Sequence, residues 1–138
     1  MDIERLIGSQ CRRDWERTDP DDVATVRVAA VGLGWFTRGR ALPALADSDR
    51  CEPTVLVSGS PGKADRVAGE FDAVERTLTY EEYADGVGTD AYDAVYVCTP
   101  NAFHLDHARA AAAHGKAVLC EKPLEASVDR AERLVAAA

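Results

Sequence analysis

The sequence has no long hydrophobic run. No stretch of about 18 or more consecutive apolar residues occurs, as a membrane-spanning helix would need. Its start, MDIERLIGSQ, lacks the basic and apolar regions of a secretory signal. The 138 residues, 46% of them hydrophobic, suffice for one domain with a single core. We therefore expect a soluble, cytoplasmic protein that does not interact with a membrane.

The sequence also lacks any Cys-x-x-Cys pair. Its four cysteines lie far apart, at Cys11, Cys51, Cys98 and Cys120. Closely spaced cysteines are typical of zinc sites, and cysteine-dense short chains are typical of secreted disulfide frameworks. We therefore expect no metal site and no disulfide framework, and we interpret the four residues as buried thiols.

Lysine is scarce. The only lysines are Lys63, Lys116 and Lys122, and the net charge is -8. This acidic balance argues against a nucleic-acid or anionic-membrane surface, because both attract basic patches. Aspartate is abundant in loops such as TDPDD, and with so little lysine this composition suggests a protein from a high-salt cytoplasm.

From Val26 onward, short apolar runs alternate with helical stretches. This alternation is typical of βαβ units and predicts an α/β fold with a Rossmann-like, doubly wound parallel sheet. The expected strands cover residues 26–31, 54–58, 75–78, 94–98 and 116–123. The expected helices cover residues 39–46, a segment from Pro61, a segment after Thr79, residues 103–114, and a segment capped by Ser127. Residues 1–24 are expected to form an N-terminal arm. Residues 25–138 are expected to form an incomplete NAD(P)-binding Rossmann domain that ends before the last strand of a complete Rossmann sheet.

Several residues are typical of helix ends. Ser60 is placed to cap a helix whose first position is Pro61. Thr79 and Glu82 have the spacing of a capping box. Gly115 is suited to the C-terminal cap of the helix that precedes it. These signals support the placement of helices between the strands.

The glycine motif after the first strand is incomplete. In VAAVGLGWFTRG, Gly32 and Gly34 match the first two glycines of G-x-G-x-x-G, but Thr37 stands at the third position. Gly32 permits a tight turn, and Gly34 allows the backbone to approach a pyrophosphate at the start of the next helix. We expect Thr37 to displace this helix slightly and to offer its hydroxyl to the helix cap or to a phosphate. An ordinary turn is the alternative.

The end of the second strand lacks the acidic residue that an NAD site usually carries about 20 residues beyond the glycines. Ser58 and Ser60 stand there instead, and Lys63 follows. Two hydroxyls and a cation would tolerate a 2′-phosphate, whereas a carboxylate would repel it. The sequence therefore favours NADP over NAD, unless both serines serve only to cap a helix.

The segments VGLGW, DAVYVCTPNAFH and CEKPLEAS together resemble the Gfo/Idh/MocA oxidoreductase family. RRDW and TVLVS are similar further to sugar dehydrogenases of salt-loving archaea, of the glucose-fructose oxidoreductase or D-xylose 1-dehydrogenase kind. The resemblance implies a Rossmann domain followed by a larger α/β domain that supplies the sugar pocket and the usual subunit interface. We therefore expect this chain to lack the substrate domain, and the full-length form to be a homo-oligomer.

The resemblance also implies a catalytic residue. Lys122 corresponds to the family's catalytic lysine, which lies beside the nicotinamide and the substrate hydroxyl. A lysine partly desolvated by cofactor can hold or relay the proton that leaves a sugar hydroxyl. Glu121 would orient its loop, and Pro123 resembles the family position that fixes a cis turn.

Further residues are expected at the cofactor by the same resemblance and by their positions: Trp35, Phe36, Thr99, Pro100, Asn101 and His104. Asn101 is the expected hydrogen-bond partner. His104 is interpreted either as a ligand contact or as a packing residue at a helix start. Trp35 and Phe36 either line the nicotinamide pocket or pack under the expected second domain.

The function expected is the oxidation of a sugar, an aldose at C1 of the D-xylose or D-glucose type, with NADP as cofactor and NAD possible. The alternative is a nucleotide-binding module without catalysis. A methyltransferase also has a glycine-rich first turn, but it typically carries an acidic residue after the second strand. The sequence does not select the sugar.

Overall fold

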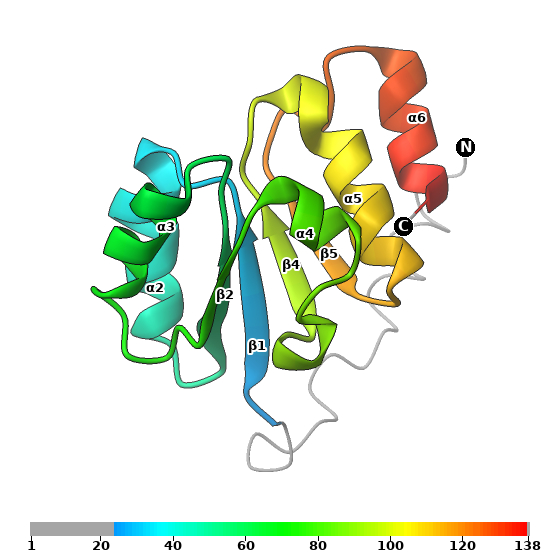
Figure 1. Ribbon diagram of the computed structural model, residues 1–138. Coiled ribbons are helices and arrows are strands. Elements are labelled where there is room, and N and C mark those ends of the chain that lie inside the picture. The colour runs from blue at the N-terminus through cyan, green and yellow to red at the C-terminus, as the bar shows by residue number, and fades with distance from the viewer. Residues whose placement is uncertain (1–23, 138) are drawn as a thin grey trace, which may run out of the picture.

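The computed structural model describes residues 24–137. Cys11, RRDW and the expected arm up to residue 23 lie outside the described residues. Five parallel strands form one sheet in the order β3-β2-β1-β4-β5. Figure 1 shows β2, β1, β4 and β5 of this sheet in that order. They are β1 Val26–Val31, β2 Cys51–Val57, β3 Arg76–Leu78, β4 Ala94–Val97 and β5 Ala117–Cys120. The strand order reverses beside β1, as it does in doubly wound sheets, so the predicted fold class is confirmed.

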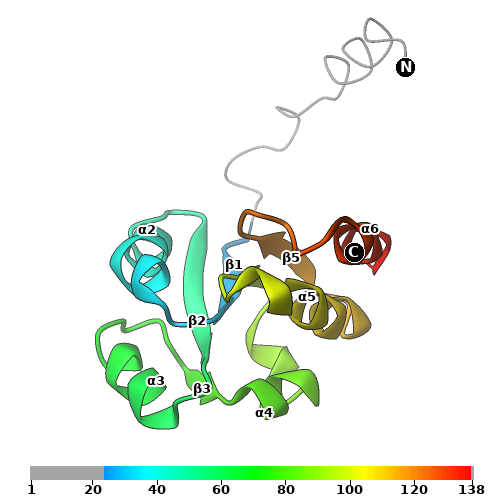
Figure 2. The same cartoon turned by 90° about the horizontal axis from the view of Figure 1, so that it is seen from above.

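Helices cover both faces of the sheet (Figure 2). They are α2 Leu42–Ala46, α3 Pro61–Ala68, α4 Tyr80–Ala84, α5 His104–Ala113 and α6 Val128–Ala137. Leu42 of α2 and Val67 of α3 share one buried cluster with Leu56 of β2. Tyr83 of α4 and Ala111 of α5 belong to a second cluster on the opposite face. No helix within residues 24–137 has the length and apolarity that crossing a bilayer requires.

The helix after β1 begins earlier than expected. Helical residues start at Trp35, directly after the glycine turn, and not at Gly39. A π-helical segment, Thr37–Ala41, joins this start to α2. Pro43 lies just after the segment, inside the helix. Proline has no amide hydrogen and its ring crowds the preceding turn, so the wider π turn accommodates it without ending the helix.

β2 also begins earlier than expected, at Cys51 and not at residue 54. Pro53 lies within the strand, and the pairing with β1 shifts register between Val28 and Ala29. β3 pairs with β2 only from Val55 onward, so Pro53 has a neighbouring strand on one side only. A proline is tolerated at such an irregular position because no ladder bond is lost on the open side.

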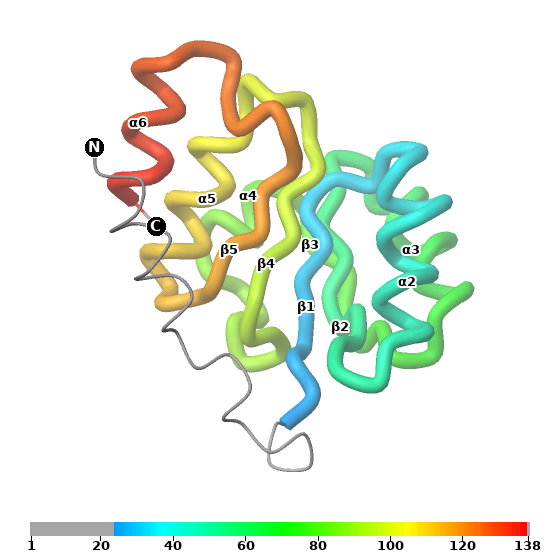
Figure 3. The backbone as a smooth tube through the Cα atoms, turned by 180° about the vertical axis from the view of Figure 1, so that it is seen from behind, coloured from blue at the N-terminus to red at the C-terminus, as the bar shows by residue number. Residues whose placement is uncertain are grey.

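β5 is shorter than expected. Its pairing with β4 runs from Ala94↔Ala117 to Val97↔Cys120, and β4 itself ends at Val97. One further amide, that of Glu121, donates to the Val97 carbonyl at 2.9 Å. The prediction that β5 reaches Pro123 is therefore wrong, because the neighbouring strand ends first. Figure 3 shows β4 and β5 side by side in the sheet.

The structure confirms three of the expected helix ends: the capping box at Thr79, the cap at Gly115 and the cap at Ser127. In the capping box, the Thr79 amide donates to Glu82 Oε2 at 2.8 Å, and the Glu82 amide donates to Thr79 Oγ1 at 3.2 Å. Gly115 adopts φ +67° after α5, and its amide donates to the Ala112 carbonyl. Ser127 Oγ accepts from the Arg130 amide in the first turn of α6. These contacts hold the helices that flank the strand ends.

Candidate functional site

A cavity of about 240 Å³ lies at the carboxyl ends of three neighbouring strands. Its lining residues are Phe36, Cys98, Thr99, Glu121 and Lys122. Phe36 comes from the helix after β1, the next two follow β4, and the last two follow β5. Carboxyl ends of parallel strands meet at one edge, so residues far apart in sequence converge there. Four of the five were expected at the site; Cys98 was interpreted only as a buried thiol.

The two glycines of the first turn have different structural roles. Gly32 adopts φ +94°, and a Cβ there would clash with the Cys98 carbonyl oxygen and lie 2.8 Å from Thr99 Cγ2. Gly32 therefore lets the β1 turn pack directly on the end of β4. A Cβ at Gly34 would meet no atom within 4 Å. The backbone at Gly34 consequently borders open space at the start of a helix, where an anion is favoured.

Thr37 does not have the expected role. Its side chain is fully buried, and its Oγ1 has no hydrogen-bond partner among the described residues. The first bond of the helix runs from the Arg38 amide to the Gly34 carbonyl at 3.1 Å, and no side chain caps the helix. The prediction that Thr37 caps the helix is wrong, because no cap bond forms. Its buried position does not support the prediction that it reaches a phosphate.

The two aromatic residues after the turn differ in position. Phe36 lines the cavity, whereas Trp35 does not and is 70% exposed. Their rings stack on each other with centroids 5.8 Å apart. Phe36 is thus placed to contact a ligand in the cavity, and Trp35 extends the aromatic surface outward from it.

The end of β2 presents one free hydroxyl. Ser58 is buried, and its Oγ accepts from the Ser60 amide at 3.2 Å, so it shapes the turn. The prediction that Ser58 offers a hydroxyl to a ligand is therefore not supported by its position. Ser60 precedes Pro61 at the start of α3 as predicted, but its hydroxyl makes no cap bond and is exposed. Lys63 lies one turn further along α3 and is half-buried.

The loop after β4 is held by local contacts. Thr99 lines the cavity, and its Oγ1 donates to the Pro100 carbonyl at 3.4 Å. Asn101 begins a 3-10 turn, Asn101–Phe103, that leads into α5. Pro100 and Asn101 lie beside the cavity without lining it. α5 therefore begins at His104, one residue later than expected.

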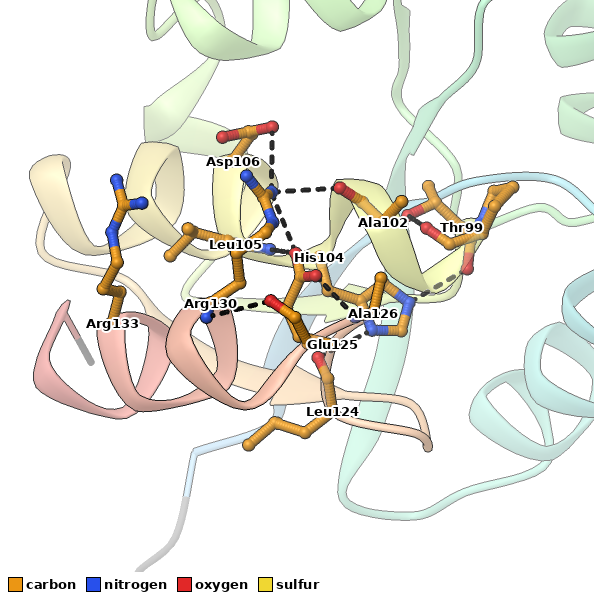
Figure 4. A network of polar contacts seen from close by, with 12 residues as sticks. Thr99, Ala102, His104, Leu105, Asp106, Leu124, Glu125, Ala126, Arg130 and Arg133 are labelled. Atoms are coloured by element: carbon orange, nitrogen blue, oxygen red, sulfur yellow. Dashed lines mark hydrogen bonds and ion pairs between the residues drawn. The ribbon is translucent and has the colours of Figure 1, made fainter.

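His104 is not a ligand contact. It is 1% exposed, and both ring nitrogens face backbone carbonyls: Nε2 lies 2.9 Å from the Thr99 oxygen and Nδ1 lies 3.1 Å from the Leu124 oxygen (Figure 4). The position of His104 therefore does not support the prediction that it binds the cofactor directly. Its alternative, a buried residue at the start of a helix, is what the structure contains.

The loop after β5 carries Glu121 and Lys122 into the cavity. Tyr96 of β4 donates its hydroxyl to Glu121 Oε1 at 2.8 Å, and Glu121 Oε2 accepts from the Lys122 amide at 3.2 Å. Burial and the bond to Glu121 raise the pKa of Tyr96 well above its usual value, so the phenol remains a donor. The bond between Lys122 and Pro123 is cis, as the resemblance implied.

The side chain of Lys122 is exposed and borders the cavity. Within residues 24–137, no hydrogen bond or ion pair engages its ammonium group. An amine in this position can exchange a proton with a group in the cavity. Tyr96 was not expected at the site, because it lies within the expected strand 94–98 and no motif singled it out.

A buried carboxylate anchors the rest of the β5 loop. Glu125 Oε1 accepts from the Leu105 amide at 3.1 Å and from Arg130 Nη2 at 2.9 Å (Figure 4). Its other oxygen accepts from the Ala126 amide. The hydrogen bond from Arg130, with the two amides, lowers the pKa of Glu125 to about 2. Nothing in the sequence around Glu125 predicts this network, because a single glutamate shortly after a proline is not a recognisable motif.

A larger hollow, of about 370 Å³, lies on the face of the sheet that carries α2. Its lining is mostly aliphatic, with Tyr96, Ser48 and Cys51 as the polar members, and it includes no charged side chain. It offers no acid, base or phosphate-binding group. The smaller cavity at the strand ends is therefore the candidate site.

The chain is similar in sequence to known dehydrogenases. It is 51% identical over 136 residues to D-xylose 1-dehydrogenase [NADP(+)] of Haloarcula marismortui, covering 98% of this chain and 37% of that protein. It is 34% identical over 113 residues to the scyllo-inositol 2-dehydrogenase (NADP(+)) of Bacillus subtilis, covering 82% of this chain and 33% of that protein. The expected similarity to sugar dehydrogenases of salt-loving archaea is thereby confirmed.

Solved structures of similar fold cover a comparable part of the chain. An aldose-aldose oxidoreductase from Caulobacter crescentus, complexed with glycerol, superposes with a TM-score of 0.76 at 31% identity. The superposed part covers 83% of this chain and 34% of the Caulobacter crescentus protein. A 3-ketoreductase from Actinomadura kijaniata, in complex with NADP and TDP-benzene, gives a TM-score of 0.73 at 34% identity, with the same coverage of both chains.

These relatives are much longer than the present chain, which spans about a third of their length. The family model described as "Oxidoreductase family, NAD-binding Rossmann fold" matches residues 26–138. The match includes all five strands and every residue of the cavity. The chain therefore belongs to the Gfo/Idh/MocA oxidoreductase family, within its NAD-binding Rossmann domain.

Proposed function

We propose that this chain is the cofactor-binding part of an NADP-dependent oxidoreductase that oxidises an aldose at C1 to the lactone, with D-xylose or D-glucose as the type of substrate. The observation that supports this most is the convergence of Phe36, Thr99, Glu121 and Lys122 on one cavity. An apolar ring, a hydroxyl, a carboxylate and an amine suit a site where a flat cofactor ring meets a sugar hydroxyl.

The first turn suits a dinucleotide. Open space at Gly34 leaves room for a pyrophosphate beside the backbone, and the amides of Trp35 and Phe36 lie ahead of the first helical hydrogen bond. These amides and the helix dipole favour the negative charge of a phosphate. Gly32 and Gly34 would then hold the pyrophosphate while Phe36 and Thr99 contact the nicotinamide end.

The end of β2 supports NADP over NAD. The hydroxyl of Ser60 is exposed and does not cap α3, and Lys63 follows one turn later. The alternative that both serines serve only as helix caps loses its support, because Ser60 makes no cap bond. Both curated relatives named above carry NADP(+) in their names. Ser60 and Lys63 would bind the 2′-phosphate.

The proposed chemistry assigns a proton to Lys122. When bound, the oxidised cofactor accepts the hydride from C1 of the sugar. The hydroxyl at C1 must lose its proton in the same reaction, and the amine of Lys122 is placed to take it. Glu121, held by Tyr96 and by the Lys122 amide, fixes the backbone from which this amine projects.

Cofactor binding by the 138-residue chain tests the proposal. We expect NADPH fluorescence titrations in high salt to give an affinity about tenfold higher than that for NADH, because the 2′-phosphate adds charge-assisted contacts. Ser60→Asp should reverse the preference, since a carboxylate repels the phosphate. Arg66→Met, which changes an exposed charge on the same helix, is the matched control. Tighter binding of NADH by the unaltered chain would contradict the NADP assignment.

Turnover distinguishes the enzyme from a binding module. The second candidate function is a module that binds cofactor without catalysis; the chain spans 37% and 33% of the two curated relatives. NADPH formation from D-xylose and D-glucose should therefore be measured on this chain and on any longer form of the protein. The arm over residues 1–24, a separate substrate domain, a homo-oligomeric state and a cytoplasmic location remain parts of the proposal.

A further inference from the structure

His104 connects the two loops that line the candidate cavity. It is the first residue of α5, and its ring lies between the backbone oxygens of Thr99 and Leu124. Thr99 belongs to the loop after β4, and Leu124 follows Lys122 by two residues in the loop after β5. Figure 4 shows the ring between the two loops. One buried side chain thus bridges two segments that are separate in the sequence.

The bridge begins where the sheet ends. Strand pairing between β4 and β5 stops at Val97↔Cys120, and the last backbone bond joins Glu121 to Val97. Beyond these pairs, sheet hydrogen bonds no longer set the distance between the loops. Glu125 fastens the β5 loop to the start of α5 through the Leu105 amide, but it makes no bond to Thr99. Arg130 Nη2 also joins the two segments, because it donates to the Ala102 carbonyl and to Glu125 Oε1. Among the hydrogen bonds of residues 24–137, however, only those of the His104 ring connect Thr99, which lines the cavity, to the loop after β5.

We propose that His104 is a positioning residue that sets the separation of Thr99 and Lys122, and with it the nicotinamide end of the cofactor site. It acts through the backbone, because a side chain that is 1% exposed does not touch a ligand. This inference rests on the proposed function. It also predicts an asymmetry, since the adenosine end, at Ser60 and Lys63, follows β2 and has no contact with His104.

A second histidine on α5 provides a matched control. His107 is half-buried one turn along the helix, and its ring packs against Tyr80 and Tyr83 with centroids 5.0 Å and 6.0 Å away. Within residues 24–137, no hydrogen bond joins its ring to either loop that lines the cavity. His104→Phe and His107→Phe are therefore the same replacement on the same helix, and only the first removes the bridge.

Two ligands separate positioning from general damage. Adenosine 2′,5′-bisphosphate reports on the adenosine end alone, and NADPH reports on both ends. For His104→Phe we expect an affinity for NADPH about tenfold lower, since small displacements at a site of this kind cost at least that much, and an affinity for the bisphosphate within about twofold of the original. His107→Phe should leave both affinities within about twofold. Equal losses of both ligands in His104→Phe would overturn the proposal, as would an unchanged affinity for NADPH.

Hydrogen exchange tests the bridge without any ligand. In folded His104→Phe, the amides of residues 121–126 and of the Asn101–Phe103 turn should exchange at least about tenfold faster, because the loops open locally more often. Those of His107→Phe should not. If the unaltered chain binds neither ligand, the proposed function is contradicted. The exchange measurement still tests the positioning role in that case, and unchanged exchange at both loops in His104→Phe would overturn it. Should His104→Phe not fold, His104→Gln, which replaces the ring by a flexible amide, serves both measurements. Full NADPH affinity in it would contradict the need for the imidazole ring.

Discussion

The two ends of β5 each carry a lysine, and the two lysines have opposite surroundings. Lys116 precedes the strand, and its Nζ donates to the Thr89 and Tyr92 carbonyls at 2.7 Å and 2.8 Å while lying 5.2 Å from the centre of the Tyr92 ring. Lys122 follows the strand, and within the described part of the chain no polar partner engages its ammonium group. A charge with satisfied donors stabilises the fold, whereas one without them is available to a ligand.

The same contrast distinguishes the two edges of the sheet, the amino edge where the strands begin and the carboxyl edge where they end. At the amino end, Arg27 of β1 donates from Nη2 to Asp93 Oδ1 at 2.7 Å and from Nη1 to the Asp90 carbonyl at 2.8 Å. At the carboxyl end, the hydroxyl of Ser60 and the backbone at Gly34 border solvent. Charges on Arg27 and Lys116 at the amino edge thus have polar partners, whereas the groups of the candidate site at the carboxyl edge face open space. Five replacements test this division, in order of expected effect.

Replacement of Lys122 should have the largest effect. In a form of the protein that turns over sugar, Lys122→Met should lower kcat about 100-fold or more, because the hydroxyl proton loses its acceptor. Its free energy of unfolding should change by less than about 0.5 kcal/mol, since an exposed side chain is replaced. Steady-state kinetics and urea unfolding measure the two quantities. The matched variant Lys116→Met should keep the original kcat, and a full kcat in Lys122→Met would remove the catalytic assignment.

The two glycines of the first turn should separate stability from binding. Gly32→Ala should lower the free energy of unfolding by about 3 kcal/mol or more, because a positive φ and a clash with the Cys98 carbonyl add together. Gly34→Ala should leave stability within about 0.5 kcal/mol, since its Cβ enters open space. It should nevertheless weaken NADPH binding, measured by fluorescence. Unaltered NADPH affinity in Gly34→Ala would place the pyrophosphate elsewhere.

Replacement of Lys116 should lower stability without affecting the site. Lys116→Met leaves the Thr89 and Tyr92 carbonyls without their donor, and we expect a loss of about 1.5–3 kcal/mol in the free energy of unfolding. NADPH affinity should stay unchanged when it is measured well below the unfolding transition. A stability equal to that of the unaltered chain would show that the amino edge is not held by this charge.

Acid should act weakly on the amino edge. Hydrogen bonds from Arg27 lower the pKa of Asp93 from 3.8 to about 2. A depressed carboxyl pKa contributes stability that is complete above the ordinary value and is lost as pH falls toward the lowered one. The stability gap between the unaltered chain and Asp93→Asn should therefore shrink from pH 5 to pH 2 in urea titrations. The gap should be small throughout, because this pair is exposed. A gap that widens in acid would contradict the assignment.

Local sequence patterns predicted the order of elements well. Alternating apolar runs placed every strand of the sheet, and the Thr79 capping box and Gly115 cap formed as expected because their contacts join residues close in sequence. The boundaries that depend on a neighbouring strand were less accurate. β5 ends at Cys120 because β4 ends at Val97, and no pattern within residues 116–123 contains that information.

The sequence predicted which residue types form the candidate site, but it did not predict where each side chain lies. Four of the cavity residues were expected, since each follows a strand whose carboxyl end must reach the same edge. Thr37 and Ser58 were expected to offer their hydroxyls to the cofactor, and both are buried. The sequence contains no sign of which way a side chain turns when the helix after Gly34 begins early and includes a π segment.

The sequence by itself determined the parallel sheet, the glycine turn and the loops that bring Thr99 and Lys122 to one edge, because these follow from periodicity and from residues that restrict the local backbone. Only the tertiary structure decided which side chains face the cavity, that Tyr96 holds Glu121, and that His104 bridges two loops. These contacts join residues 20 or more positions apart or depend on burial, and their geometry exists only after the strands have paired and the helices have packed.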